Sequence, residues 1–135
     1  MPLAVDSSAL IAVFKGESEA WFQFILAHAR EQQLLVCDVV FAEVAPFVPD
    51  EATLLTRLEK IGIAFDPIQS QTAFLAGEIY SRYRKAGGPR MSMIPDFLIG
   101  AHALRQADGL LTSDRGYLRR HFSNLRTIAP NGTDA

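Results

Sequence analysis

The sequence predicts an α/β domain built around a mostly parallel sheet, and two observations predict this fold class. Along the 135 residues, short apolar runs typical of strands alternate with longer runs that have helical spacing. In addition, a helix of about 16 Å at 96–106 is followed by a strand of about 16 Å at 109–113. Because the chain returns by the distance it travelled, we expect Asp96 and Asp114 at the same edge of the domain.

The first half of the chain contains residues that start and stop these elements. Ser7 and Ser8 offer hydroxyls that can cap the first helix, and Gly16 breaks it. Asp38 is expected to cap a later helix, which Pro46 terminates. The expected strands are 3–5, 34–37 and 61–65, and the expected helices are 9–14, 18–30, 39–45 and 51–60.

The second half is organised around the helix–strand segment described above. Pro95 suits a helix start, and Gly109 is a typical stop. The other expected elements are helix 69–85, loop 87–93, helix 117–122 and strand 126–128. We therefore expect one domain over residues 1–130, followed by a disordered tail at 131–135.

Composition favours a globular protein and excludes several functional classes. Hydrophobic residues make up 49% of the chain and charged residues 21%, which is ordinary. No apolar run approaches the length of a membrane span and no signal-peptide pattern opens the chain, so a cytoplasmic protein without a membrane partner is expected. The single Cys37 excludes an internal disulfide and a cysteine-based zinc cluster.

The net charge of −2 gives no bulk electrostatic case for nucleic-acid binding, although a local basic rim is compatible with it. Basic residues gather in two groups. These are Arg82, Arg84, Lys85 and Arg90, followed by Arg115, Arg119, Arg120 and Arg126. Taken singly, most of them fit a solvated helix face.

Four acidic residues stand out, and three of them have an ordinary structural alternative. Asp6 and Asp96 could be helix caps, and Asp114 could open a turn. Glu43 is harder to explain, because its helix has hardly any other polar residue and is expected to be buried. A buried ionised carboxylate needs a partner.

Four carboxylates at one edge of a sheet would repel one another. A pair about 4 Å apart costs about 4 kcal/mol at an effective dielectric near 20, so several pairs would rival the stability of a small domain. Protonation of one or more acids is one resolution. A divalent cation is the cleaner one, because oxygen ligands suit Mg²⁺ or Mn²⁺, which can activate water for phosphodiester hydrolysis.

Other chemistries fit the sequence less well. The three histidines are scattered, and His102 points about 120° away from Asp96 on an ideal helix. A zinc site or a histidine-assisted nucleophile is therefore not expected. Neither a GxGxxG pattern nor a P-loop is present, so a phosphate cradle has no support.

Taken together, the acids and their surroundings resemble a PIN domain, and more narrowly a VapC-type toxin of bacterial toxin–antitoxin systems. The resemblance runs from Leu3 to about Pro130. The residues that carry it are segment 5–11 around Asp6, Glu43, segment 95–103 with Asp96, and Leu111-Thr112-Ser113-Asp114.

This resemblance implies a three-layer α/β/α fold with a central, mostly parallel sheet of about four or five short strands. It also implies an endoribonuclease in which Asp6, Glu43, Asp96 and Asp114 hold Mg²⁺ or Mn²⁺ and carry catalysis. Ser8 and Thr112 would orient the carboxylates. The implied partners are an RNA substrate, a cognate antitoxin and a second copy of the chain. We expect Arg82, Arg84, Lys85, Arg90, Arg115 and Arg119 to position the RNA backbone.

Two alternatives remain open. The first is a catalytically silent PIN-like module that binds RNA or protein. The presence of all four acids argues against it. The second is a phosphohydrolase or phosphoacceptor domain with an Asp nucleophile after the first strand. It would need a lysine at the end of a later strand, and none is placed there.

Overall fold

The computed structural model describes residues 1–88, 94–113, 120–130 and 132–134. Within these residues the strands form a six-stranded sheet in the order β3-β2-β1-β4-β5-β6. The strands are β1 (Leu3–Val5), β2 (Leu34–Val36), β3 (Ile63–Phe65), β4 (Leu110–Leu111), β5 (Thr127–Ala129) and β6 (Gly132–Asp134). The first five are mutually parallel, and β6 pairs antiparallel to β5. The prediction of a mostly parallel sheet is confirmed.

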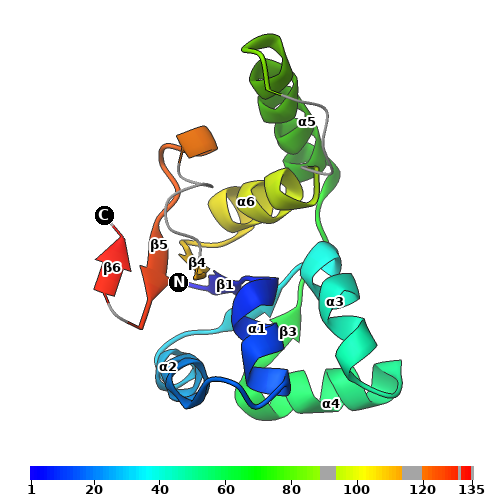
Figure 1. The fold of residues 1–135 in the computed structure, drawn as a ribbon, viewed down its shortest axis with the longest axis vertical. Coiled ribbons are helices and arrows are strands. Elements are labelled where there is room, and N and C mark those ends of the chain that lie inside the picture. The colour runs from blue at the N-terminus through cyan, green and yellow to red at the C-terminus, as the bar shows by residue number, and fades with distance from the viewer. Residues whose placement is uncertain (89–93, 114–119, 131, 135) are drawn as a thin grey trace.

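Helices cover both faces of this sheet. They are α1 (Ser7–Phe14), α2 (Glu19–Ala29), α3 (Asp38–Val44), α4 (Glu51–Ile61), α5 (Ser70–Lys85) and α6 (Ile94–Gln106), with a short 3-10 helix at Ala45–Phe47. Figure 1 shows α5 and α6 on one side of the sheet and α1, α2 and α4 on the other. α3 contacts both α1 and α6. The arrangement is the α/β/α sandwich that the sequence predicts.

The order in which the chain adds strands to the sheet reverses once, and the point of reversal lies between the neighbouring strands β1 and β4. The chain moves outward from β1 to β3, and α5 and α6 then carry it back to β4 on the other side of β1. Val5 lies opposite Leu111, and the backbone N–H of Asp6 donates to the carbonyl of Leu111 at 2.9 Å. In open α/β sheets, ligands bind beyond the carboxyl ends of strands at such a reversal.

The core lies where the central strands meet the helices. All residues of β1, β2 and β4 are buried, as expected for parallel strands covered on both faces. Phe97 of α6 and Phe122 are the largest fully buried side chains among the described residues, and the ring of Phe97 packs edge-on against Tyr80 of α5. This packing joins α5 and α6 into one layer.

The structure differs from the sequence-based expectations in three places. β4 is only two residues long, and Gly132–Asp134 forms a strand where a disordered tail was expected. Asp38 does not cap α3. Cys37 occupies the N-cap without a side-chain hydrogen bond, and Asp38 lies in the first turn, where its charge suits the helix dipole. The expected helix at 117–122 lies partly outside the described residues.

Among the described residues, no helix is both long and apolar enough to span a membrane.

Candidate functional site

Asp6 lies directly after β1, at the reversal of the sheet, and is half-buried. It is the N-cap of α1, because its Oδ1 accepts a hydrogen bond from the backbone N–H of Ser7 at 2.7 Å. Its other oxygen, Oδ2, accepts from the hydroxyl of Thr112 at 2.6 Å. The capping interpretation of Asp6 is therefore correct, and the same carboxylate also binds a residue from the neighbouring strand.

Hydroxyl groups surround this carboxylate. Thr112 follows β4 and is 1% exposed, so its hydrogen bond to Asp6 is shielded from water. Ser8 makes a longer contact with the same Oδ2, at 3.4 Å, and accepts a hydrogen bond from Ser113 at 3.0 Å. Hydrogen bonds to an ionised carboxylate favour its charged form and restrict its orientation. Ser8 and Thr112 thus both contact the first acid of the set.

Asp96 lies in the first turn of α6 and is half-buried. Glu43 lies near the end of α3, and α3 packs against α6. Glu43 and Pro95, the residue before Asp96, line the same surface hollow of about 450 Å³. The fold thus places Glu43 beside the start of the helix that carries Asp96.

The prediction that Glu43 is buried is wrong, because its side chain is exposed. α3 has only seven residues, and Val40 and Val44 supply its buried side. Val39 and Phe41 are partly buried against the core, whereas Ala42 and Glu43 are exposed on the side that its neighbours leave uncovered. Glu43 therefore needs no partner to offset burial. A role in a metal site is supported only by its position beside the start of α6.

Several residues of the predicted site lie outside the described residues. They are Asp114, Arg90, Arg115 and Arg119. Of the remaining predicted RNA contacts, Arg82 and Lys85 are exposed, whereas Arg84 donates to the carbonyl of Gly88 at 2.9 Å. In the part of the chain that the structure describes, no group of three or more His, Cys, Asp or Glu side chains could hold a metal ion.

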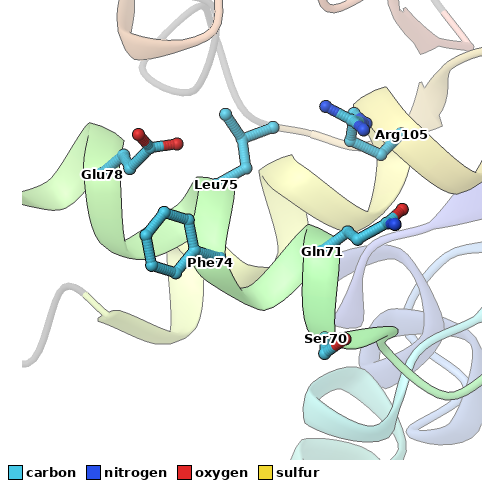
Figure 2. A pocket seen from close by; sticks show the side chains of 6 residues that line it. All are labelled: Ser70, Gln71, Phe74, Leu75, Glu78 and Arg105. Atoms are coloured by element: carbon cyan, nitrogen blue, oxygen red, sulfur yellow. The ribbon is translucent and has the colours of Figure 1, made fainter.

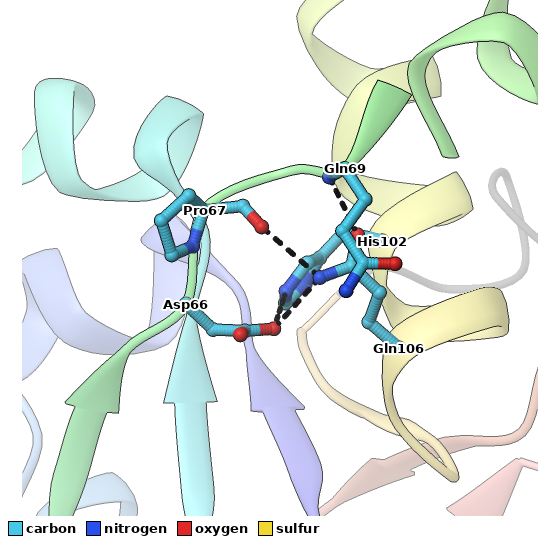
Figure 3. Close-up of polar contacts among 5 residues, drawn as sticks. All are labelled: Asp66, Pro67, Gln69, His102 and Gln106. Carbon is cyan, nitrogen blue, oxygen red and sulfur yellow. Dashed lines mark hydrogen bonds and ion pairs between the residues drawn. The ribbon is translucent and has the colours of Figure 1, made fainter. Parts of the chain in front are cut away.

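Sequence reasoning missed a polar network at the end of β3. His102 of α6 is 1% exposed, and its Nε2 lies 2.8 Å from Oδ2 of Asp66, the residue after β3. Gln106, one turn later on α6, donates to the same oxygen at 2.9 Å and to the carbonyl of Pro67 at 3.0 Å. The backbone N–H of Gln69 donates to Gln106 at 2.9 Å (Figure 3).

This network ties the loop after β3 to the helix that carries Asp96. The spacing of His102 and Gln106, four residues apart on one helix face, was a signal in the sequence, as was an Asp directly after a strand. Neither signal identifies Asp66 as the partner of His102, because the strand order of the sheet brings these residues together.

Neither Cys37 nor His121 has the properties of a covalent nucleophile. Burial raises the pKa of the Cys37 thiol to about 11, so this thiol stays protonated at neutral pH. Burial and, to a smaller extent, the charge of Arg120 lower the pKa of His121, whose ring packs against Phe97. Carboxylates and hydroxyls remain the characteristic groups of the site.

Comparison with protein families identifies this fold. The family model for the PIN domain matches residues 3–122. The chain therefore belongs to the PIN domain family. A search of curated protein sequences found no match to the chain.

Solved structures with the same fold cover nearly the whole chain. The crystal structure of VapBC2 from Rickettsia felis, bound to a DNA fragment from its promoter, matches with a TM-score of 0.73 and 15% identity, covering 99% of this chain and 100% of that one. DNA-bound VapBC from Salmonella typhimurium has a TM-score of 0.67 and 15% identity, covering 96% and 98%. VapBC-1 from nontypeable Haemophilus influenzae has a TM-score of 0.69 and 18% identity, covering 97% and 99%. At these identities the likeness establishes the fold.

Proposed function

We propose that this protein is a metal-dependent endoribonuclease that acts as the toxin of a toxin–antitoxin pair. The observation that carries the proposal is the hydrogen bond between Thr112 and Asp6 in a PIN-family fold. It fixes a carboxylate at the reversal of the sheet, where ligands of α/β sheets bind. Membership of the PIN family and the VapBC structures of the same fold support this reading.

The residues proposed to hold Mg²⁺ or Mn²⁺ are Asp6, Glu43, Asp96 and Asp114. All are oxygen donors, which hard divalent cations prefer. Because the described residues alone supply no group of three donors, the proposal requires Asp114, which lies outside them. A bound cation would supply an activated water for phosphodiester hydrolysis.

Other side chains have supporting roles in this proposal. Ser8 and Thr112 hold the Asp6 carboxylate in one orientation, which limits the rearrangement needed when a cation binds. The RNA backbone would be positioned by exposed basic residues, a role that carries no sequence information by itself. Those proposed for it are Arg82, Lys85, Arg90, Arg115 and Arg119. Arg84 is a weaker candidate, because it already binds the carbonyl of Gly88.

The proposed partners are a cognate antitoxin and a second copy of the chain, and the proposed location is the cytoplasm. The antitoxin proposal is supported by three solved VapBC structures that share this fold over almost its full length.

A second candidate is a silent PIN-like module that binds RNA or protein without cleaving it. The two candidates differ in whether the acids are needed for a chemical step.

RNA cleavage by the purified, antitoxin-free chain separates the two candidates. Asp96→Asn keeps the shape of the side chain but removes its charge, so cleavage in Mn²⁺ should fall by at least about 100-fold. The matched control is Asp108→Asn. Asp108 is exposed and precedes β4, at the opposite edge of the sheet. Full activity of Asp96→Asn would contradict the nuclease proposal, and RNA binding without cleavage by the wild type would favour the silent module.

A further inference from the structure

The polar network at the end of β3 ties α6 to the sheet through directional contacts. Its anchor is Asp66, whose backbone N–H donates to the carbonyl of Val36 in β2 at 2.8 Å. One oxygen of the Asp66 side chain, Oδ2, lies 2.8 Å from Nε2 of His102 and accepts a hydrogen bond from Gln106 at 2.9 Å. An ionised carboxylate only accepts, so Nε2 of His102 is the donor. Two successive turns of α6 are thus bound to one atom.

Every polar group of the Gln106 side chain has a partner. Its Nε2 donates to Oδ2 of Asp66 and to the carbonyl of Pro67, and its Oε1 accepts from the backbone N–H of Gln69 at 2.9 Å (Figure 3). All three partners belong to the short segment between β3 and α5. Because hydrogen bonds depend on angle as well as distance, three of them leave one orientation for this amide. They therefore also restrict the rotation of α6 about its own axis.

The outer side of the same junction is an open hollow of about 470 Å³ (Figure 2). Arg105, the residue before Gln106, lines this hollow together with Ser70 and Gln71 at the start of α5. Arg105 is exposed and forms no ion pair with any other described residue. At this end of α6, the polar network thus supplies the directional contacts and the outer side does not.

The rotation of α6 decides where Asp96 points. Asp96 lies in the first turn of the same helix, about 9 Å along the axis from His102. The helix runs without interruption from Ile94 to Gln106, so a rotation at one end is transmitted to the other. Turning it by about 10–20° would move a carboxylate on its surface by roughly 1–2 Å, whereas the groups of a functional site must be held within about 0.5 Å.

Apolar packing at the start of α6 holds the helix in the core. The ring of Phe97 lies 5.2 to 6.0 Å, between centroids, from the rings of Tyr80, Tyr83, His121 and Phe122. Attraction between apolar surfaces is not directional, so this packing fixes the depth of the helix more firmly than its rotation. The hydrogen bonds of the polar network supply the missing direction.

We propose that Asp66, His102 and Gln106 are positioning residues for the metal site, because they hold Asp96 in one orientation. None of the three binds the cation, and each acts through the rotation of α6. The inference rests on the proposed function for the existence of a metal site and adds the residues that set its geometry. Groups that orient metal ligands typically contribute about 10- to 100-fold to metal affinity, and we expect an effect of this size.

Mn²⁺ binding to the folded, antitoxin-free chain, measured by titration calorimetry, tests this role. Asp66→Leu removes the acceptor that faces His102 and Gln106, so the Mn²⁺ dissociation constant should rise at least about 10-fold. Asp66→Asn removes the same charge but keeps an acceptor oxygen, so its dissociation constant should stay within about 3-fold of the wild type. The two variants separate the hydrogen bonds from the charge of Asp66.

Gln106→Leu gives a second test that does not alter charge. It removes three hydrogen bonds at a half-buried position, so it keeps the test open should Asp66→Leu fail to fold. This variant should also raise the Mn²⁺ dissociation constant at least about 10-fold.

Two controls separate positioning from stability. Leu58→Ala leaves a cavity at a position that is 2% exposed on α4, on the opposite face of the sheet from α6. It should melt at a lower temperature but bind Mn²⁺ as the wild type does. Arg105→Gln changes α6 on the side of the open hollow and should also keep the affinity of the wild type.

The possible results are distinct. Wild-type affinity in Asp66→Leu or Gln106→Leu would overturn the positioning role and leave the metal site intact. An equal loss of affinity in Asp66→Asn or in Leu58→Ala would overturn it as well, because charge or stability would then explain the effect. A wild type that binds no Mn²⁺ would overturn the proposed metal site and this role with it.

Discussion

At the scale of single residues, the interaction that defines the site is the short hydrogen bond from Thr112 to Asp6. The two residues are far apart in sequence but lie at the ends of the adjacent parallel strands β1 and β4. Because Thr112 is buried, no water molecule can easily replace its hydroxyl. Asp6 is therefore held by the helix that it caps and by a second strand.

Removing this hydroxyl should destabilise the protein and weaken its proposed activity. Thr112→Val keeps the shape of the side chain but removes the hydroxyl that donates to the Asp6 carboxylate at 2.6 Å, which should cost about 1–3 kcal/mol of unfolding free energy. RNA cleavage should fall by about 10- to 100-fold if Thr112 orients a metal ligand. Urea denaturation and a cleavage assay measure the two effects.

Thr112→Ser is the control for this experiment, because it retains the hydroxyl and loses only a methyl group. It should restore most of the activity and most of the stability. Equal behaviour of the Val and Ser variants would mean that the hydrogen bond to Asp6 contributes nothing.

At the scale of elements, the position of α6 determines where Asp96 lies. The helix is fixed by two contacts on different sides. Phe97 packs into the core, and His102 and Gln106 bind Asp66 at the end of β3. The second contact links the outer strand of the sheet to the helix that returns to β4. We infer that the polar network sets the orientation of α6 against the sheet.

Breaking this network should lower stability even when the core stays filled. His102→Phe keeps an aromatic ring at a position that is 1% exposed but removes the nitrogen that faces Asp66, so unfolding free energy should fall by about 1–3 kcal/mol. His102→Ala should cost more, about 2–5 kcal/mol, because it also leaves a cavity. Chemical denaturation gives both values. A His102→Phe protein as stable as the wild type would show that packing alone holds α6.

Most of the elements could be predicted from the sequence, because they depend on local signals. β1 is the apolar run that ends just before Asp6. α4 begins after Asp50, whose side chain caps the helix by accepting a hydrogen bond from the backbone N–H of Thr53 at 2.8 Å. The partners of His102 could not be predicted, because Asp66 reaches it through strand order rather than spacing. The exposure of Glu43 was also missed, since an apolar helix sequence does not reveal how much of a short helix its neighbours cover.

At the scale of the whole molecule, the reversal of the sheet explains why distant residues share one edge. β1 and β4 are neighbours, so the residues that follow them, Asp6 and Thr112, meet. α3 and α6 contact each other, which brings Glu43 beside the start of α6.

Thermal melting of the antitoxin-free chain with and without Mn²⁺ tests the proposed metal site most directly. A cation that binds only the folded state stabilises it by about 2.7 kcal/mol at 100 times its dissociation constant. For a domain of this size, that should raise the melting temperature by about 5–10 °C. We expect this increase for the wild type and for Asp108→Asn, and its loss in Asp96→Asn. An unchanged melting temperature in the wild type, or an equal increase in Asp96→Asn, would contradict a metal site built on these acids.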